Sequence, residues 1–270
     1  MSGRPGAGGQ GLGLRHKRVQ HVRRLLSQAS YRRAEGAFVL EGAKLLEEAL
    51  RARVPLEAVY LAPDAGPGLD DVVDQAFHAG VRVFHLRPGV MERVADTVTP
   101  QPVLAVAGST LRPLEDVREE TLLAVCADLR DPGNLGTVLR TAEAAGVGAI
   151  ICTNGTVDVY NPKCVRASAG SVFHVRVVAG GKPVEVLEQL GAQGMRRLGA
   201  AATGGTAYDE VDFRGPTALV LGNEAAGLPP DVTRILDGLV SVPMVGRAES
   251  LNVGMAAAVL CFEAARQRRT

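Results

Sequence analysis

The sequence predicts an α/β protein in which a small N-terminal α/β unit precedes a larger domain with a mainly parallel sheet. Strand-like and helix-like segments alternate along most of the 270 residues, as is typical of α/β folds. The run 121–127 is almost entirely apolar, as expected for a strand buried on both faces of a sheet. A stretch with Gly108, Pro113 and several charged residues separates the two parts.

The elements of the smaller unit follow from short apolar runs separated by amphipathic segments. Strands are expected at 38–40, 59–61, 81–84 and 103–107, and helices at 42–53 and near 69–79. An earlier helix, within the basic segment 15–33, is indicated by the helical spacing of Val19, Val22, Leu25 and Leu26. Together these elements predict a compact three-layer unit.

The larger domain repeats strand–helix units, which predicts a parallel sheet whose ligand-binding loops follow the strands. Its strands are expected at 121–127, 149–152, 173–178, 198–202, 218–221 and 239–242. Its helices are expected at 135–145, where Gly146 can end the helix, at 183–193 and at 251–266. We therefore divide the chain into a disordered tail at 1–13, the N-terminal unit at 14–107, a linker at 108–120 and the larger domain at 121–270.

Composition favours a globular protein of the cytoplasm. Hydrophobic residues make up 46% of the chain and charged residues 22%, and no apolar run reaches the ~18 residues of a membrane span. No apolar segment follows the basic N-terminal residues, so no secretory signal is predicted. The four cysteines form no CxxC pair, which predicts buried free thiols in a reducing compartment. The spacing of the histidines predicts no metal site.

The net charge of +1 conceals a strongly basic N-terminal segment. Residues 1–34 hold eight Lys and Arg and no acidic residue, so the remaining residues sum to −7. One interpretation is a solubilising tail. The apolar helical stripe favours instead a helix that rests on the body of the protein and presents cations outward, which predicts a polyanionic partner.

Polar residues gather at the start of the predicted helix 135–145. Pro132 fixes a turn, and Gly133 and Gly136 allow the backbone to approach a ligand. Asn134 either caps this helix or contacts a ligand. Arg140 lies on an otherwise apolar helix, so its guanidinium should emerge near the sheet edge; the alternative is an ion pair with the residue three positions later, Glu143.

A second polar segment, 221–228, follows a predicted buried strand. Its glycine, Gly222, permits close contact with a nucleoside, and Glu224 either caps a turn or faces substrate or cofactor.

The third polar segment, 242–255, joins the last strand to the last helix. Pro243 and Met244 offer a fixed extended backbone and a thioether, which suit an adenine slot. Ser250 is either the cap of the last helix or a functional residue, whereas Asn252, in its predicted first turn, has less structural reason to be polar.

Taken together and in this order, the three segments resemble the SpoU (TrmH-like) RNA ribose 2′-O-methyltransferases of the SPOUT superfamily. The resemblance is strongest over 121–266 and includes 160–171, with further matches at 38–42 and 95–101. The smaller unit resembles the SpoU substrate-binding domain, which is similar to ribosomal RNA-binding proteins. The resemblance implies a deep trefoil knot at the C-terminus, an exception to the usual absence of knots, and an obligate homodimer formed through the SPOUT domain.

The resemblance also implies the residues of the site, with S-adenosylmethionine as cofactor and no metal. The catalytic positions correspond to Asn134, Arg140, Glu224, Ser250 and Asn252. The cofactor positions correspond to Ala202, Thr203, Gly204, Gly222, Asn223, Gly227, Val242, Pro243, Met244, Ser250, Leu251 and Asn252. The residues expected to bind RNA are Arg15, Lys17, Arg18, Arg23, Arg24, Arg32, Arg33, Lys163 and Arg166. In such dimers the RNA site is composite, and Arg140 approaches the cofactor of the other subunit.

The implied reaction is transfer of a methyl group from S-adenosylmethionine to a ribose 2′-hydroxyl of structured RNA. The expected target is 23S ribosomal RNA, because the smaller unit resembles ribosome-associated RNA binders. The alternatives are a transfer RNA 2′-O-methyltransferase and a non-catalytic RNA-binding protein. A nicotinamide-dependent dehydrogenase is disfavoured because no glycine-rich G-x-G-x-x-G turn follows a predicted strand.

Overall fold

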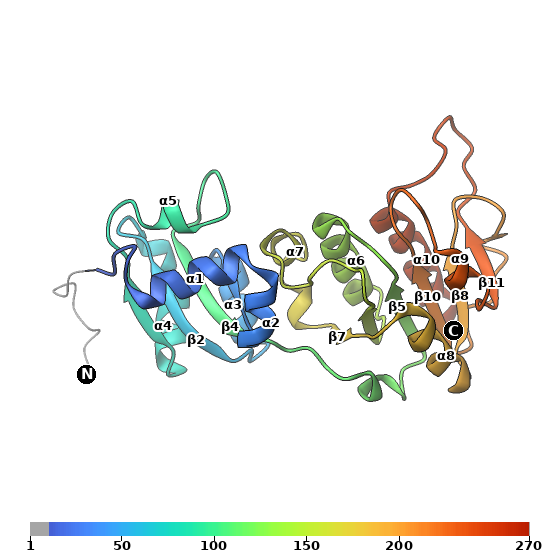
Figure 1. The fold of residues 1–270 in the computed structure, drawn as a ribbon, viewed down its shortest axis with the longest axis horizontal. Helices are drawn as coiled ribbons and strands as arrows, with labels where there is room; N and C mark the ends of the chain where they lie inside the picture. Colours follow the sequence, from blue (N-terminus) through green and yellow to red (C-terminus); the bar gives the residue numbers. More distant parts are fainter. Residues whose placement is uncertain (1–10, 270) are drawn as a thin grey trace. The chain divides into compact units, whose positions relative to one another are not determined.

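The computed structural model describes residues 11–269 and divides the chain between Ser109 and Thr110 into two units (Figure 1). Residues 1–10 of the predicted disordered tail lie outside the described residues. The rest of that tail is ordered, since Leu12 pairs with Leu86. Most of the predicted linker belongs to the second unit, where Arg112 pairs with Val178 and Val117 is buried in the core.

The first unit is a four-stranded mixed sheet of order β1-β4-β2-β3 with helices around it. β4 is antiparallel to both β1 and β2, and β3 is parallel to β2. The strands are β1 (Ala37–Glu41), β2 (Leu56–Leu61), β3 (Arg82–His85) and β4 (Val103–Gly108). The helices are α1 (Lys17–Ser27), α2 (Ala29–Glu35), α3 (Ala43–Arg51), α4 (Asp70–His78) and α5 (Met91–Val94), with a short 3-10 turn η1 (Pro67–Leu69).

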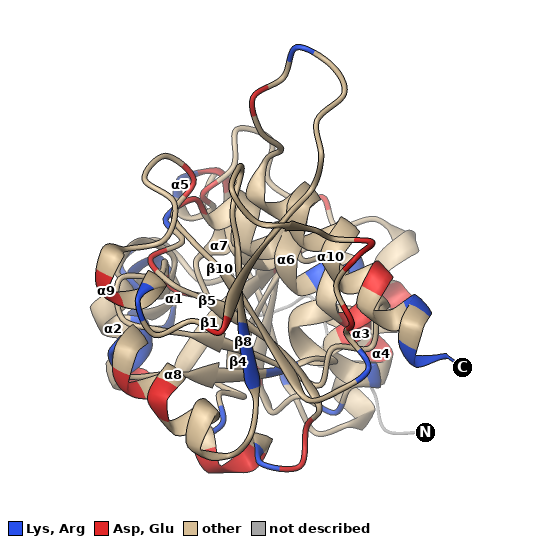
Figure 2. Ribbon diagram, turned by 90° about the vertical axis from the view of Figure 1, so that its right-hand side faces the viewer, with Lys and Arg blue, Asp and Glu red and all other residues tan. Residues whose placement is uncertain are grey.

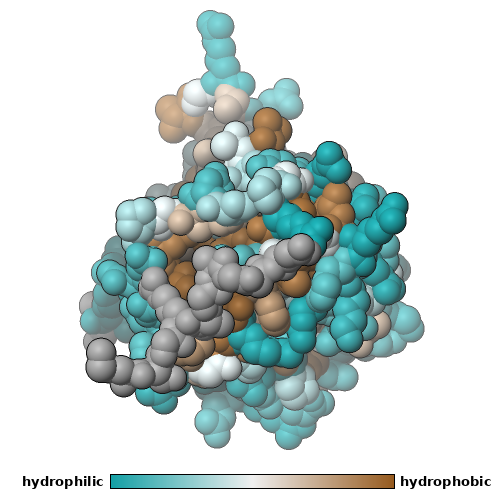
Figure 3. Space-filling model, turned by 90° about the vertical axis from the view of Figure 1, so that its left-hand side faces the viewer, coloured by the Kyte–Doolittle hydropathy of each residue, from teal (hydrophilic) through white to brown (hydrophobic). Residues whose placement is uncertain are grey.

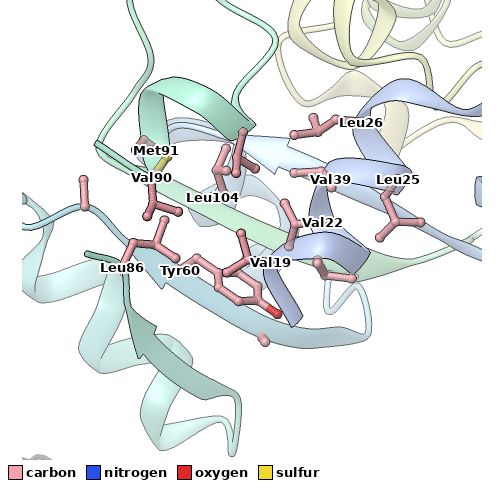
Figure 4. Packing of buried hydrophobic residues seen from close by; sticks show 14 residues of the cluster. Val19, Val22, Leu25, Leu26, Val39, Tyr60, Leu86, Val90, Met91 and Leu104 are labelled. Atoms are coloured by element: carbon pink, nitrogen blue, oxygen red, sulfur yellow. The ribbon is translucent and has the colours of Figure 1, made fainter. Parts of the chain in front are cut away.

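The predicted apolar stripe of the basic segment forms the contact between α1 and the sheet. Val19, Val22 and Leu25 are each at most 2% exposed and pack against β-strand residues such as Val39 and Tyr60 (Figure 4). The segment is two helices rather than one, because the backbone is extended at Gln28. α1 is therefore held by core packing, with its basic residues outside that contact.

A small cavity and an apolar patch lie on the first unit. The cavity, of about 170 Å³, is lined by residues of β2, β3 and α4, including Val83 and Phe77, which is 38% exposed. Viewed from the side of this unit, hydrophobic residues come to the surface between hydrophilic ones (Figure 3).

The second unit is a seven-stranded sheet of order β7-β6-β5-β10-β8-β11-β9 in which every pairing is parallel. The strands are β5 (Leu122–Cys126), β6 (Ala149–Cys152), β7 (Arg176–Ala179), β8 (Arg196–Ala200), β9 (Thr206–Ala207), β10 (Thr217–Leu221) and β11 (Gly238–Ser241). The helices are α6 (Pro132–Ala144), α7 (Pro162–Ala167), α8 (Pro183–Ala192), α9 (Pro230–Thr233) and α10 (Val253–Arg268), with 3-10 turns η2 (Leu114–Val117) and η3 (Ser171–Phe173). The predicted parallel α/β architecture is confirmed.

Two boundaries of this unit differ from the prediction by three residues, more than any other boundary of its predicted elements. The strand expected at 173–178 begins at Arg176, because Ser171–Phe173 turns as a 3-10 helix. The helix expected at 135–145 begins at Pro132, because the side chain of Asp131 accepts a hydrogen bond from the backbone N–H of Asn134 and caps it. In Figure 2 the charged residues lie mostly on helices and loops, while most of the sheet is uncharged.

The sheet order decides which loops meet. β10 lies between β5 and β8, and β11 follows β8. The loops after these four strands therefore gather at one edge of the sheet, where the three polar segments lie. Between β11 and α10 the chain extends well beyond the sheet before it returns (Figure 1).

The cysteines are free thiols, and Cys126, Cys164 and Cys261 are buried. Burial raises the pKa of Cys261 to about 12.

Among residues 11–269, no helix is long and apolar enough to cross a membrane. In the same part of the chain, no three His, Cys, Asp or Glu side chains group as metal ligands would.

Candidate functional site

A cavity of about 560 Å³ lies at the carboxyl ends of β8, β10 and β11 and is closed by the start of α10. Its volume is in the range that small-molecule sites occupy. Nine of the predicted cofactor residues line it, namely Ala202, Gly222, Asn223, Gly227, Val242, Met244, Ser250, Leu251 and Asn252. Thr203, Gly204 and Pro243 are not among the lining residues.

The floor of the cavity is a tightly closed loop after β10. A Cβ atom on Gly222 would lie 2.6 Å from the carbonyl carbon and oxygen of Gly227, so only glycine fits this backbone path. Asn223 and Gly227 exchange two backbone hydrogen bonds of 2.9 Å, and Gly227 has a φ of +69°. The Asn223 side chain accepts from the N–H groups of Ala225 and Ala226, both at 3.0 Å. Asn223 thus shapes the loop that presents its backbone to the cavity.

A chain of hydrogen bonds joins three predicted catalytic residues from three elements. Asn252 donates through Nδ2 to Oδ1 of Asn134 at 2.8 Å, and Asn134 donates through its own Nδ2 to Oε1 of Glu224 at 3.0 Å. Backbone N–H groups of Asp131 and Arg130 donate to the same carboxylate at 3.1 and 3.3 Å. The network ties the start of α6 and the start of α10 to the cavity loop.

Neither Asn134 nor Ser250, the two residues considered as helix caps, caps its helix. Asn134 is not the cap of α6, because Asp131 is, and its side chain is committed to the network. Asn252, expected to lie inside the last helix, is instead its N-cap and accepts from the N–H of Gly254 at 2.9 Å. Ser250 precedes that cap and lines the cavity.

The environment of Glu224 keeps its carboxyl group ionised. Burial raises the pKa of this carboxyl, but hydrogen bonds from the Asn134 side chain and from backbone N–H groups outweigh it. The pKa is therefore below its ordinary value of 4.5. A carboxylate with a lowered pKa is a weak proton acceptor, so its geometry suits orientation of Asn134 better than proton removal.

We expect Glu224 to stabilise the fold in a pH-dependent way. Since its folded pKa is below its unfolded value, its contribution is complete above about pH 4.5 and is lost as pH falls through the folded pKa. The unfolding free energy of the wild type minus that of Glu224→Gln should therefore shrink below this pH. Urea unfolding of both proteins between pH 7 and pH 3 measures it. Glu249→Gln, an exposed loop change, is the control, and a difference that stays constant with pH would contradict the assignment.

Arg140 lies apart from the cavity of its own chain. It is exposed on α6 and does not line the cavity. Among the described residues it has no ion pair with Glu143, which instead accepts a hydrogen bond from Ser171 at 3.5 Å. The alternative predicted for Arg140, an ion pair with Glu143, is therefore not formed among the described residues. The Arg140 side chain is exposed to solvent instead.

The residues predicted to bind RNA differ in exposure. Arg15, Lys17, Arg23, Arg24, Arg33 and Lys163 are exposed, and Arg18 and Arg166 are partly buried. Arg32 is buried at 5% exposure and donates to the carbonyl oxygens of Leu25 and Leu26 at the end of α1. Its assignment to RNA binding is therefore wrong, because it joins α2 to α1.

Some of the predicted cations are already engaged by other side chains, as Arg18 and Lys163 illustrate. The guanidinium of Arg18 lies 4.6 Å from the ring centre of Phe84. Lys163 donates to Asp131 at 2.9 Å, which holds α7 to the cap of α6, and its ammonium side chain remains 58% exposed. The hydrogen bond from Lys163 is also the main cause of a lowered pKa of Asp131.

The cavity wall also contains small apolar residues that were not predicted from the sequence. These residues are Ala200, Ala201, Ala225, Ala226, Val240, Val253, Ala256 and Leu260. Three of them recur at helical spacing in the first half of α10, which marks one helix face but does not distinguish a cavity wall from a core contact.

Comparison with known proteins matches each unit to a family. Residues 121–262 match the SpoU rRNA Methylase family, and residues 16–105 match the MRM3-like substrate binding domain. The chain is 34% identical over 225 residues to the 23S rRNA (guanosine(2553)-2′-O)-methyltransferase RlmP of Bacillus subtilis, covering 83% of this chain and 87% of the relative.

Two further likenesses come from Streptomyces viridochromogenes. Its 23S rRNA (uridine(2479)-2′-O)-methyltransferase is 36% identical over 186 residues, covering 66% of this chain and 65% of the relative. The crystal structure of the SpoU methyltransferase AviRb in complex with the cofactor AdoMet matches with a TM-score of 0.84 and 29% identity, covering 95% of this chain and 99% of that chain.

Proposed function

The chain belongs to the SpoU rRNA methylase family, and we propose that it transfers a methyl group from S-adenosylmethionine to a ribose 2′-hydroxyl of 23S ribosomal RNA. The observation that carries this proposal is the cavity at the carboxyl ends of β8, β10 and β11, with the Asn252–Asn134–Glu224 network at its rim. Both curated relatives named above are 23S rRNA 2′-O-methyltransferases, one acting on guanosine and one on uridine. They support 23S ribosomal RNA as the substrate, but because they act on different nucleosides they do not indicate which base the methylated ribose carries.

The cavity fits S-adenosylmethionine by size and by its lining. The backbone of Gly222 is bare to the cavity because no side chain can be accommodated there. Apolar side chains of Val242, Met244 and Leu251 suit an adenine ring, and Asn252 adds a polar group. We propose that these residues hold the cofactor.

The residues of this chain have to orient the ribose and manage the charge of its hydroxyl group. When bound, S-adenosylmethionine supplies a methyl group that its sulfonium already activates. A guanidinium is a poor base, because arginine keeps its proton in proteins, so Arg140 does not suit proton removal. We assign it to holding an RNA phosphate and stabilising charge that develops on the 2′-oxygen. Asn134, oriented by Glu224, and Ser250 complete the polar side of the site.

Methyl transfer from radiolabelled S-adenosylmethionine tests the function. Total ribosomal RNA and bulk transfer RNA, lacking the native modification, are offered separately, and the labelled position is mapped by resistance to alkaline cleavage. We expect label in 23S ribosomal RNA. Label in transfer RNA alone would favour the transfer RNA alternative. No label, together with no cofactor binding in calorimetry, would leave a non-catalytic RNA-binding protein.

We also propose a homodimer formed through α6 and α10. α10 packs against α6 on one side, yet exposes Met255 and Phe262 at 60% and 48%. These large apolar side chains are two helical turns apart and so share one face of α10. Two such side chains exposed on the same face are unusual for a helix that borders solvent, and they are typical of an interaction surface. A partner on this face would also bring a second copy of Arg140, exposed on α6, towards the cavity of the first chain.

The double variant Met255→Glu/Phe262→Glu should shift the protein from dimer to monomer, because the interface would bury two carboxylates without partners. Sedimentation velocity measures the change. Phe77→Glu, at an exposed phenylalanine of the first unit, is the matched control and should leave the mass unchanged. A dimer that survives the double variant would rule out this face.

We also propose a trefoil knot in the second unit and a cytoplasmic location. After β11 the chain returns to form α10, and α10 contacts both α6 and β10. This return supports a knotted path. Three buried free thiols support a reducing compartment.

A further inference from the structure

The short loop from Asp128 to Asp131 is built in an unusual way. Asp128 has a φ of +63°, a left-handed conformation that few non-glycine residues adopt, although aspartate and asparagine adopt it more often than most. Its carbonyl oxygen accepts from Nδ2 of Asn223 at 3.0 Å. Gly155 packs so closely that an added Cβ would lie 2.7 Å from Oδ1 of Asp128. Strained backbone of this kind collects at functional sites.

This loop fixes Arg130 at the rim of the cavity. The backbone N–H of Arg130 donates to Oε2 of Glu224 at 3.3 Å, and Glu224 lines the cavity. Its side chain donates through Nε to Oδ1 of Asp128 at 3.1 Å. The Arg130 side chain is 72% exposed, and its two terminal amino groups have no hydrogen-bond partner among residues 11–269.

Stability does not explain this arrangement. An ion pair as exposed as that of Arg130 with Asp128 adds little to the stability of the fold. What the pair does achieve is orientation, because a guanidinium held through Nε presents its Nη groups in a fixed plane. That geometry suits the bidentate recognition of a phosphate.

We propose that Arg130 binds a phosphate of the RNA strand beside the target ribose and so positions the substrate. This inference rests on the proposed function, since it names a contact of that same site. Because Asp128 already holds the guanidinium in place, less side-chain entropy is lost when the phosphate binds. Arg130 is a positioning residue on the same chain as the cavity that it serves, unlike the proposed role of Arg140.

The test compares Arg130→Ala with a closely matched control elsewhere in the second unit. Arg214 pairs with Asp212 at the same two-residue spacing, through Nε at 2.9 Å, and is 71% exposed. For Arg130→Ala we expect KM for 23S ribosomal RNA to rise about tenfold, and the slope of log K for RNA against log salt to fall by about one. The turnover number and the Kd for S-adenosylmethionine should stay within about twofold. Arg130→Lys should restore part of the RNA affinity, and Arg214→Ala should resemble the wild type.

The outcomes separate this inference from the proposed function. An Arg130→Ala protein with wild-type KM and salt slope would overturn the phosphate contact and leave only an ion pair. Loss of S-adenosylmethionine binding in the same variant would also overturn it, because the residue would then shape the cavity. A wild-type protein that binds the cofactor and methylates no RNA would refute the proposed function itself.

Discussion

Replacing Arg140 with alanine is expected to lower kcat/KM for 23S ribosomal RNA by about 100-fold or more, as removal of a charge-stabilising donor does in other enzymes. The Kd for S-adenosylmethionine should not change, because Arg140 does not line the cavity of its own chain. Its exposed position on α6, with no partner among the described residues, leaves its guanidinium available to a second chain. Single-turnover methylation and calorimetry measure the two quantities separately.

A mixing experiment tests whether Arg140 acts across the dimer. An Arg140→Ala chain and a chain with a blocked cavity, Gly222→Val, should each be inactive, whereas a heterodimer would contain one complete composite site. Random reassociation of equal amounts should restore about a quarter of the wild-type sites. Activity that stays at the level of the separate variants would show that Arg140 serves its own chain. Glu143→Ala, one turn along the same helix, controls for local damage to α6.

The second large effect is expected at Gly222. Gly222→Ala should weaken S-adenosylmethionine binding by about 100-fold or more, because the new Cβ would lie 2.6 Å from the Gly227 carbonyl and 2.8 Å from the backbone nitrogen of Leu228. Backbone on the opposite side cannot turn away as a flexible side chain would. The loop 222–227 must therefore open, and its two 2.9 Å hydrogen bonds between Asn223 and Gly227 would be lost.

Calorimetric titration with S-adenosylmethionine measures this loss. Gly215→Ala is the matched control, because a Cβ at Gly215 meets no atom within 4 Å, and it should bind the cofactor as the wild type does. Circular dichroism establishes that both variants are folded. A folded Gly222→Ala protein with unchanged affinity would mean that the cavity loop does not contact the cofactor.

Local patterns in the sequence were sufficient for most of the fold. The apolar run 121–127 predicted a strand buried on both faces, and all of β5 is buried between β6 and β10. The stripe of Val19, Val22 and Leu25 predicted the face that α1 packs on the sheet. Both follow because burial repeats with the period of the helix or strand, so the signal is contained in neighbouring residues.

The same periodicity did not reveal which of two adjacent arginines would be buried. Arg32 and Arg33 look equivalent in the sequence, but the extended residue Gln28 restarts the helix at Ala29. That break turns Arg32 towards the carbonyl groups at the end of α1 and leaves Arg33 exposed.

The sequence by itself determined the α/β class and singled out three polar segments of the chain. Only the tertiary structure decided how these segments combine. Asn134 and Glu224 are 90 residues apart and Asn252 and Asn134 are 118 apart, and they meet because β10 inserts between β5 and β8. Strand order is settled by the packing of the whole sheet rather than by local preference, so no segment contains it. For the same reason the anchoring of Arg130 by Asp128 and Glu224 became visible only in the folded chain.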